Sequence, residues 1–206
     1  SIAAVSAAIQ RAEEKFGSEI YLISDEPYRK LIYTDAPYPF IFNHHPRSIV
    51  ATSHSKDLGL AGERIGYAAV NPSDPGKVDL MNALNFSLRT LGFVNAPALM
   101  QRVVANIQRA TVDIDIYRKK RDLLYGNLTK IGYECVQPDG AFYVFPKSPI
   151  PDDIEFVAKL QNELVLVVPG VGFGTPGYFR ASYCVDDWVI EGATDGFSRM
   201  FAQANS

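Results

Sequence analysis

The segment from Ser53 to Tyr67 holds the residues with the most evident capacity for chemistry. Ser53 and Ser55 precede Lys56, glycines follow it closely, and Arg64 comes eight residues after the lysine. Arginine offers paired planar donors and serine offers short hydroxyl donors, so the group suits a phosphate. The lysine amine can pair with that phosphate or react as the amine of a Schiff base. Lys56 taken alone would read as an ordinary solvated charge.

A second polar group, Asp25-Glu26-Pro27-Tyr28, follows an earlier apolar run. A carboxylate at the end of a strand can hold a ring nitrogen in its protonated form. A phenol three residues later can donate a hydrogen bond to a ring oxygen. The same residues also suit an ordinary turn, because Asp and Pro are common turn residues.

Short apolar runs must position both groups. The runs over residues 20–23, 48–52 and 65–70 predict buried strands, and polar residues follow each of them. Asn71 and Pro72 close the third run. Polar residues just past buried strands are the usual layout of a site in an open α/β sheet.

The remaining pattern predicts helices and a second set of strands. Apolar spacings of three and four predict helices over residues 1–16, within 77–110 (broken near Gly92 and Pro97) and over 117–128. The pattern changes after Gly132: we expect strands over 140–145, 165–168 and 178–183, and helices over 152–164 and after Asp186. The Gly170–Gly174 segment resembles a dinucleotide loop, but it leads into a strand, so we interpret it as a turn.

Length and composition limit the classes of protein to consider. The chain has 206 residues, of which 47% are hydrophobic and 21% charged, with a formal net charge of -3. At about 150 residues per domain, this is one domain or one and a half. The balance excludes a disordered tail, a collagen-like fibre and a basic arm for nucleic acid. No apolar run is long enough to cross a bilayer.

Several single residues carry weaker signals. Cys135 and Cys184 lack metal-type spacing, so we expect two buried free thiols and a reducing, cytoplasmic compartment. His44 and His45 are adjacent with no third ligand nearby, so we expect a surface loop and no metal site. Trp188 is predicted to be a packing residue. The chain starts with Ser1 in a helical pattern, without an initiator Met, which suggests a fragment.

Together the two polar groups resemble the fold-type I pyridoxal-phosphate enzymes, specifically the class I/II aminotransferases. That family shows Asp-x-x-Tyr at a strand end, then Ser-x-Ser-Lys, an Arg eight residues beyond the Lys and a Gly-Tyr just after it. All of these occur here in order. Residues 138–143 look like the opening of the family's small-domain strand. Residues 177–183 look like the strand whose arginine, here Arg180, binds the substrate's α-carboxylate.

The resemblance implies an α/β fold in two parts. Residues 1–130 would be the C-terminal part of the large cofactor-binding domain with a partial sheet, ending in the interdomain helix. Residues 131–206 would be the α+β small domain. The family's chain is longer, and the part before residue 1 supplies more of the cofactor's cradle. We therefore expect this chain alone to bind the cofactor weakly and to turn over poorly.

The resemblance also implies a role for each matching residue. Lys56 would form the Schiff base with pyridoxal 5'-phosphate and then move a proton during the reaction. Asp25 would pair with the ring nitrogen, since a protonated nitrogen makes the ring an electron sink. The remaining roles are a hydrogen bond to the phenolic oxygen from Tyr28, phosphate binding by Ser53, Ser55 and Arg64, and α-carboxylate binding by Arg180.

The implied function is exchange of an amino group between an L-amino acid and a 2-oxo acid. The whole protein would be a cytoplasmic homodimer, with no nucleic-acid or membrane partner. One alternative is a β-lyase that splits carbon–sulfur bonds on the same fold, because it uses the same Lys, Asp and Arg. Another is the non-catalytic effector-binding domain of a transcription regulator, although no helix-turn-helix or basic segment is present. A purely structural domain would leave Lys56, Asp25 and Arg180 unexplained.

Overall fold

A computed structural model describes residues 1–205, which form two compact units. The first unit holds residues 1–30 and 35–112; the second holds residues 31–34 and the chain from Asp113 onward. Each unit combines helices with a small sheet, so the predicted α/β class is confirmed. The domain boundary expected at residues 130 and 131 stays a prediction.

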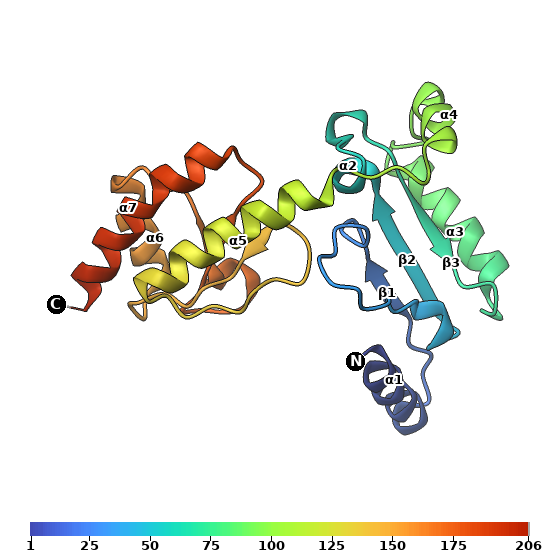
Figure 1. Ribbon diagram of the computed structural model, residues 1–206. Coiled ribbons are helices and arrows are strands. Elements are labelled where there is room, and N and C mark those ends of the chain that lie inside the picture. The colour runs from blue at the N-terminus through green and yellow to red at the C-terminus, as the bar shows by residue number, and fades with distance from the viewer. Residues whose placement is uncertain (206) are drawn as a thin grey trace. The chain divides into compact units, whose positions relative to one another are not determined.

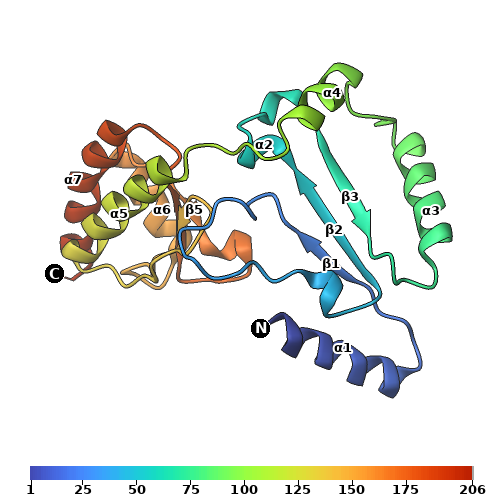
Figure 2. The ribbon, with the colours of Figure 1, turned by 45° about the vertical axis from the view of Figure 1, so that its right-hand side comes forward.

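The first unit is built on a three-stranded sheet in the order β1-β2-β3. Strand β1 (Leu22–Asp25) runs parallel to β2 (Ser48–Ser53), and β3 (Gly66–Val70) runs antiparallel to β2. Figure 2 shows this change of direction in the arrowheads of the strands. The predicted burial of β1 and β3 is wrong, because Ile23 is 64% exposed and Tyr67 is 39% exposed.

Four α-helices belong to the first unit: α1 (Ile2–Phe16), α2 (His54–Asp57), α3 (Lys77–Thr90) and α4 (Ala98–Asn106). Of two 3₁₀ turns, η1 (Ile41–Asn43) lies between β1 and β2, and η2 (Ala61–Glu63) lies between α2 and β3. The predicted stop of α1 at Gly17 is confirmed, since this glycine adopts a left-handed φ of 62°. Helix α3 lies beside β3 (Figure 1) yet buries none of its residues. Apolar faces of this unit are therefore open to solvent.

A buried amide fixes the end of the sheet that lies away from Ser53. Asn71 is 2% exposed, and its Nδ2 donates to the carbonyls of Phe42 and His45 at 3.1 and 3.0 Å. Because β3 is antiparallel, Asn71 does not share the edge of the other strand ends, as the sequence had suggested. His45 is only 1% exposed and donates from Nε2 to the Ile20 carbonyl, so its assignment to a surface loop is wrong.

The second unit packs two long helices, α5 (Ile114–Ile131) and α7 (Asp187–Ala204), against each other (Figure 1). Its sheet is antiparallel, in the order β4-β6-β5. The other elements are β4 (Tyr143–Val144), α6 (Asp153–Asn162), β5 (Val168–Pro169), the 3₁₀ turn η3 (Gly170–Phe173) and β6 (Phe179–Ser182). The predicted helices and the strands near residues 143 and 180 are present, and both strands are shorter than their apolar runs. The strand expected over residues 165–168 begins only at Val168. The predicted turn at residues 170–174 is confirmed.

An aromatic cluster around Tyr133 forms the core of this unit. The Tyr133 ring lies 5.8 Å from the rings of both Phe179 and Phe197, edge-on to each. Its hydroxyl donates to the Phe197 carbonyl at 3.0 Å, which satisfies the one polar atom that the cluster buries. Burial raises the pKa of the Tyr133 hydroxyl above its ordinary value.

Both cysteines are free, as predicted. Cys135 is half-buried and burial raises the pKa of its thiol, whereas Cys184 is exposed, so the expectation of two buried thiols is wrong for Cys184. Among residues 1–205, no helix has both the length and the apolar character needed to cross a membrane.

Leu160 and Leu164 lie four residues apart but differ in exposure, so they test the packing of the second unit's core. Leu160 is 0% exposed and Leu164 is 92% exposed. We expect Leu160→Ala to lower the free energy of unfolding by about 2–5 kcal/mol, because it removes buried methyl groups and leaves a cavity. Leu164→Ala is the matched control and should change it by less than about 0.5 kcal/mol. Urea titration followed by Trp188 fluorescence measures both, and equal losses would contradict this core.

Candidate active site

Three strand ends meet at one edge of the first unit's sheet. Asp25 and Ser53 are the last residues of the parallel strands β1 and β2. Because β3 runs the other way, its first residue, Gly66, pairs with Ser53. The antiparallel strand thus brings Arg64, two residues before Gly66, to the edge where Asp25 and Ser53 end.

Lys56 lies in the one-turn helix α2, directly after β2. Two backbone hydrogen bonds hold this turn: His54 N–H donates to the Ile65 carbonyl at 3.0 Å, and Leu60 N–H donates to the His54 carbonyl at 3.1 Å. His54 and Asp57, three residues apart, share a helix face and are buried. Lys56 itself is half-buried.

A small pocket of about 240 Å³ lies beside this turn. Ser53, Ser55 and Arg64 all contribute to its lining. The two serine hydroxyls lie 2.5 Å apart, and the Arg64 guanidinium donates to the Ala61 carbonyl at 3.0 Å. Among residues 1–205, no carboxylate pairs with Arg64, so its positive charge is not neutralised by the protein. Two hydroxyls and a guanidinium around a small pocket can bind a phosphate.

Arg64 adopts a strained backbone conformation. Its φ is 53°, in the left-handed region that residues other than glycine rarely adopt. Non-glycine residues persist there where the surrounding structure imposes it, often at functional sites. The hydrogen bond from the Arg64 side chain to Ala61, three residues earlier, accompanies this strained turn.

The Asp25 carboxylate is exposed at the end of β1. Within the described residues, no cationic side chain pairs with it. The backbone continues the strand pairing for one residue, because Glu26 N–H donates to the Ala51 carbonyl at 2.8 Å. Tyr28 follows in the turn and is half-buried. Asp25 can therefore accept a proton-bearing nitrogen without giving up an existing ion pair.

Arg180 belongs to β6 of the second unit and is described within that unit. The carbon of its guanidinium lies 4.3 Å from the centre of the Tyr143 ring and 4.2 Å from that of Phe173. Aromatic faces attract a guanidinium and leave its N–H groups directed outward. None of the carboxylates among residues 1–205 pairs with Arg180. An arginine with unpaired donors and a ring-fixed plane suits recognition of a carboxylate.

A buried carboxylate fixes the turn that carries Phe173. Asp153, 4% exposed, accepts hydrogen bonds from Val171 N–H at 2.8 Å and from Gly177 N–H at 3.2 Å. The Val171 hydrogen bond is the main cause that holds the pKa of Asp153 below its ordinary value. Asp153 thus remains charged and anchors both ends of the loop between η3 and β6.

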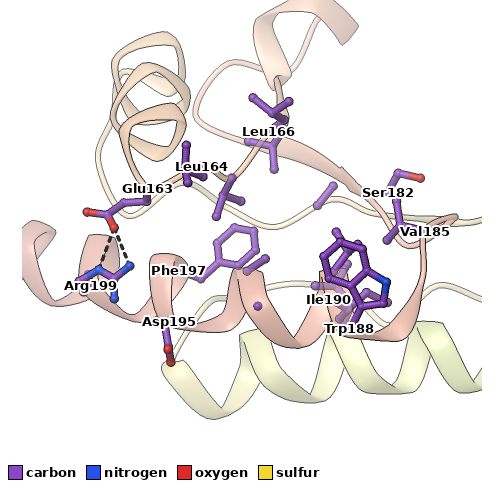
Figure 3. Close-up of a pocket in the computed structure, with 17 residues that line it drawn as sticks. Glu163, Leu164, Leu166, Ser182, Val185, Trp188, Ile190, Asp195, Phe197 and Arg199 are labelled. Carbon is purple, nitrogen blue, oxygen red and sulfur yellow. Dashed lines mark hydrogen bonds and ion pairs between the residues drawn. The ribbon is translucent and has the colours of Figure 1, made fainter.

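A larger pocket of about 680 Å³ lies elsewhere in the second unit (Figure 3). It runs between α7 and the segment of residues 163–167, and the Arg199–Glu163 ion pair of 2.7 Å lies at its border. Trp188 lies over this groove and is 71% exposed, so its predicted packing role is wrong. None of the described residues that line this groove is a predicted site residue.

Sequence reasoning missed several residues that the structure places beside the predicted ones. Phe173 and Tyr143 contact Arg180, and the half-buried Lys30 pairs with the buried Asp57 next to Lys56. The three-residue spacing of His54 and Asp57 is the one available signal, since it places both on one face of a helical turn. The contacts of Phe173 and Lys30 join segments that are distant in sequence.

Residues 7–196 match the family model of the class I and II aminotransferases. The chain belongs to this family. The resemblance seen in the sequence is thereby confirmed. A probable aspartate aminotransferase of Methanocaldococcus jannaschii is 34% identical, covering 88% of this chain and 50% of that protein. A probable aspartate/prephenate aminotransferase of Thermus aquaticus is 33% identical, covering 91% of this chain and 50% of that protein.

Solved structures agree with this assignment. An amino transferase of Eubacterium rectale is 40% identical, with a TM-score of 0.95 over 100% of this chain and 52% of that one. A mutant aspartate aminotransferase of Thermus thermophilus is 27% identical, with a TM-score of 0.80 over 97% of this chain and 54% of that one. The chain spans about half the length of the aminotransferases that it matches.

Two glycines near the small pocket test the strand pairing that forms it. A Cβ on Gly66 would collide with the Thr52 carbonyl oxygen and lie 2.9 Å from Ser53 Cα, whereas one on Gly62 would meet nothing within 4 Å. We expect Gly66→Ala to lower the free energy of unfolding by about 1–3 kcal/mol, because strands β2 and β3 must separate. Gly62→Ala, the control, should change it by less than about 0.5 kcal/mol in the same urea titration. A harmless Gly66→Ala would argue against the close approach at Ser53.

Proposed function

We propose that this chain is the part of a pyridoxal-phosphate-dependent aminotransferase that carries the cofactor lysine and the arginine for the substrate's carboxylate. One observation carries the proposal: Ser53, Ser55 and Arg64 surround one small pocket at the end of β2, directly beside Lys56. The family assignment gives that arrangement its chemical meaning.

The donor set fits the phosphate of the cofactor. Two hydroxyls offer short hydrogen bonds, and the guanidinium of Arg64 offers planar paired donors without a competing carboxylate among the described residues. The left-handed backbone of Arg64 directs this charge to the strand end. We therefore assign phosphate binding to Ser53, Ser55 and Arg64.

Asp25 and Tyr28 fit the ring of the cofactor. The Asp25 carboxylate ends the strand next to β2 and can pair with a protonated ring nitrogen, because nearby charge favours the ionised form of both partners. Tyr28 lies three residues on and offers a phenol to the ring oxygen. Neighbouring strands lie about 4.8 Å apart, so Asp25 and Ser53 can contact one bound molecule at its two ends.

Pyridoxal phosphate, when bound, supplies an electron sink for the carbon from which a proton leaves. The role that we propose for Lys56 is to hold the cofactor covalently through Nζ and then to carry this proton. Once the amino group of the substrate has displaced Nζ from the cofactor, the freed amine would take the proton from the α-carbon and deliver it to the cofactor carbon that keeps the transferred amino group. Placement on a short turn fixed at both ends favours such a transfer, which depends on orientation.

Arg180 is our proposed ligand for the substrate's α-carboxylate. Its guanidinium plane lies against Tyr143 and Phe173, and the latter is carried by the loop that Asp153 anchors. A fixed plane allows two parallel hydrogen bonds to a carboxylate, which orient the amino acid as well as bind it.

For the whole protein we propose amino-group exchange between an L-amino acid and a 2-oxo acid. The named relatives include aspartate and aspartate/prephenate aminotransferases, so L-aspartate is the first substrate to test. The family resemblance further supports a cytoplasmic homodimer. It also supports residues 1–130 as part of the cofactor domain and residues 131–206 as the small domain.

Loss of the Lys56 amine should abolish covalent attachment of the cofactor. We expect the chain mixed with pyridoxal phosphate and then reduced with borohydride to gain one cofactor mass at Lys56, because its turn is fixed beside the phosphate pocket. Lys56→Ala should lose this adduct. Peptide mass spectrometry after reduction measures it, and trapping detects even weak binding.

Lys159→Ala is the control, since that lysine forms a surface ion pair with Glu155 at 2.6 Å, and it should keep the adduct. An equal adduct in Lys56→Ala would contradict the assignment of Lys56. A separate assay tests the lyase alternative. Pyruvate and ammonia formed from cystathionine in the absence of a 2-oxo acid acceptor would indicate a lyase.

A lysine should replace Arg180 poorly. An ammonium cannot form the two parallel hydrogen bonds of a guanidinium, and hydrogen bonds to charged groups contribute about 1.5–3 kcal/mol. We therefore expect Arg180→Lys to raise the L-aspartate concentration needed for half of the absorbance change of the cofactor-loaded chain by about 10- to 100-fold. Arg199→Lys, which alters a surface ion pair, is the control. An unchanged midpoint in Arg180→Lys would remove Arg180 from the substrate site.

A further inference from the structure

A charged cluster of one half-buried and two buried side chains lies directly against the turn that carries Lys56. Lys30 Nζ is 3.3 Å from one carboxylate oxygen of Asp57, and His54 Nδ1 is 3.3 Å from the other. Asp57 and His54 are 5% and 4% exposed. None of these three side chains belongs to the proposed phosphate, ring or carboxylate sites.

The cluster is well satisfied, which is the condition for charges to remain buried. Besides Asp57, Lys30 Nζ donates to the carbonyls of Gln108 at 2.8 Å and of Ala110 at 3.1 Å. All three protons of the ammonium group can thus be used. Both oxygens of the Asp57 carboxylate also have partners. Removing one partner from such a pair leaves an uncompensated buried charge.

The Lys30–Asp57 pair joins the two polar segments of the proposed site. Lys30 follows Tyr28 by two residues, and Asp57 follows Lys56 directly. The backbone carbonyl of Asp57 attaches the turn to a further segment, because it accepts hydrogen bonds from Val112 N–H at 2.8 Å and from Thr111 Oγ1 at 3.1 Å. The turn is therefore held by the segment after β1 and by the segment after α4.

Helix α2 depends on such contacts because it has only four residues. An isolated helical turn fixes several backbone angles for one hydrogen bond and is unstable in water. His54 and Asp57 form the face that the cluster holds, while Ser55 and Lys56 lie on the remaining, half-buried sides. Fixing the buried face therefore fixes the direction in which the Lys56 side chain leaves the backbone.

We propose that Lys30 and Asp57 are positioning residues that hold α2 so that Lys56 faces the Asp25–Tyr28 segment. This inference rests on the proposed function, in which Lys56 carries the cofactor. The Lys30–Asp57 pair acts through the backbone of the turn and touches neither substrate nor cofactor. It is a determinant of the rate at which Lys56 reacts, beyond the residues that the family motifs supply.

The first test measures the turn without any cofactor. Lys30→Met and Asp57→Asn should each speed hydrogen exchange of the His54 and Leu60 amides by about tenfold or more, because the turn opens locally. Lys30→Arg keeps the charge and should restore slow exchange. Arg47→Met is the matched control: Arg47 pairs with Glu19 in the same unit and, like Lys30, has a side chain that is 23% exposed.

The second test measures the rate at which pyridoxal phosphate becomes attached to Lys56, trapped by borohydride and read by mass spectrometry. We expect attachment about tenfold slower in Lys30→Met than in the unaltered chain, since small misplacements of a reacting group cost large factors in rate. Lys30→Arg and Arg47→Met should attach at the unaltered rate. The double variant Lys30→Met with Asp57→Leu removes both charges and so leaves no unpaired charge in the cluster. It should also attach the cofactor about tenfold more slowly, and it replaces the single variant if that variant unfolds.

The outcomes separate this inference from the proposed function. Faster hydrogen exchange in Lys30→Met with an unchanged rate of cofactor attachment to Lys56 would overturn the positioning role, because the pair would then only stabilise the turn. Unchanged exchange in Asp57→Asn would overturn the hold on the turn. No adduct on Lys56 in the unaltered chain would contradict the proposed function itself, and the exchange experiment would still decide whether the pair holds α2.

Discussion

The antiparallel pairing of β3 with β2 is the constraint on which the site depends. It places Gly66 opposite Ser53 and so brings Arg64 back to the edge where β1 and β2 end. With a parallel third strand, the residues before it would lie at the far edge of the sheet, and the guanidinium could not reach the serine hydroxyls. Gly66 permits this register, because any side chain would collide with β2.

Two kinds of support hold the reactive groups on this frame. Backbone hydrogen bonds close the turn of Lys56, and buried charges with complete partners fix its hidden face. In the second unit, aromatic faces hold the plane of Arg180, and the Asp153 carboxylate anchors the loop that supplies one of these faces. In both units, buried groups fix the backbone that carries a side chain of the proposed site.

Local sequence signals predicted much of this arrangement. The apolar runs over residues 48–52 and 65–70 predicted strands β2 and β3. The spacing of Ser53, Ser55 and Arg64 predicted a shared polar group, because these residues are close in sequence, and the structure places all three around one small pocket. The direction of β3 was not predictable from its apolar run, so Asn71 was expected at the wrong edge. The contacts of Lys30 with Asp57 and of Phe173 with Arg180 were also missed, because they join distant segments and depend on burial.

At Arg64, a relaxed backbone and a positively charged side chain are conflicting requirements. Glycine would adopt a φ of 53° without strain, so replacing Arg64 by glycine would remove the steric strain of the backbone at this position. A glycine, however, would leave the serine hydroxyls without a cation. Selection for stability alone would therefore favour glycine at this position, and the proposed binding of a phosphate gives a reason for the arginine.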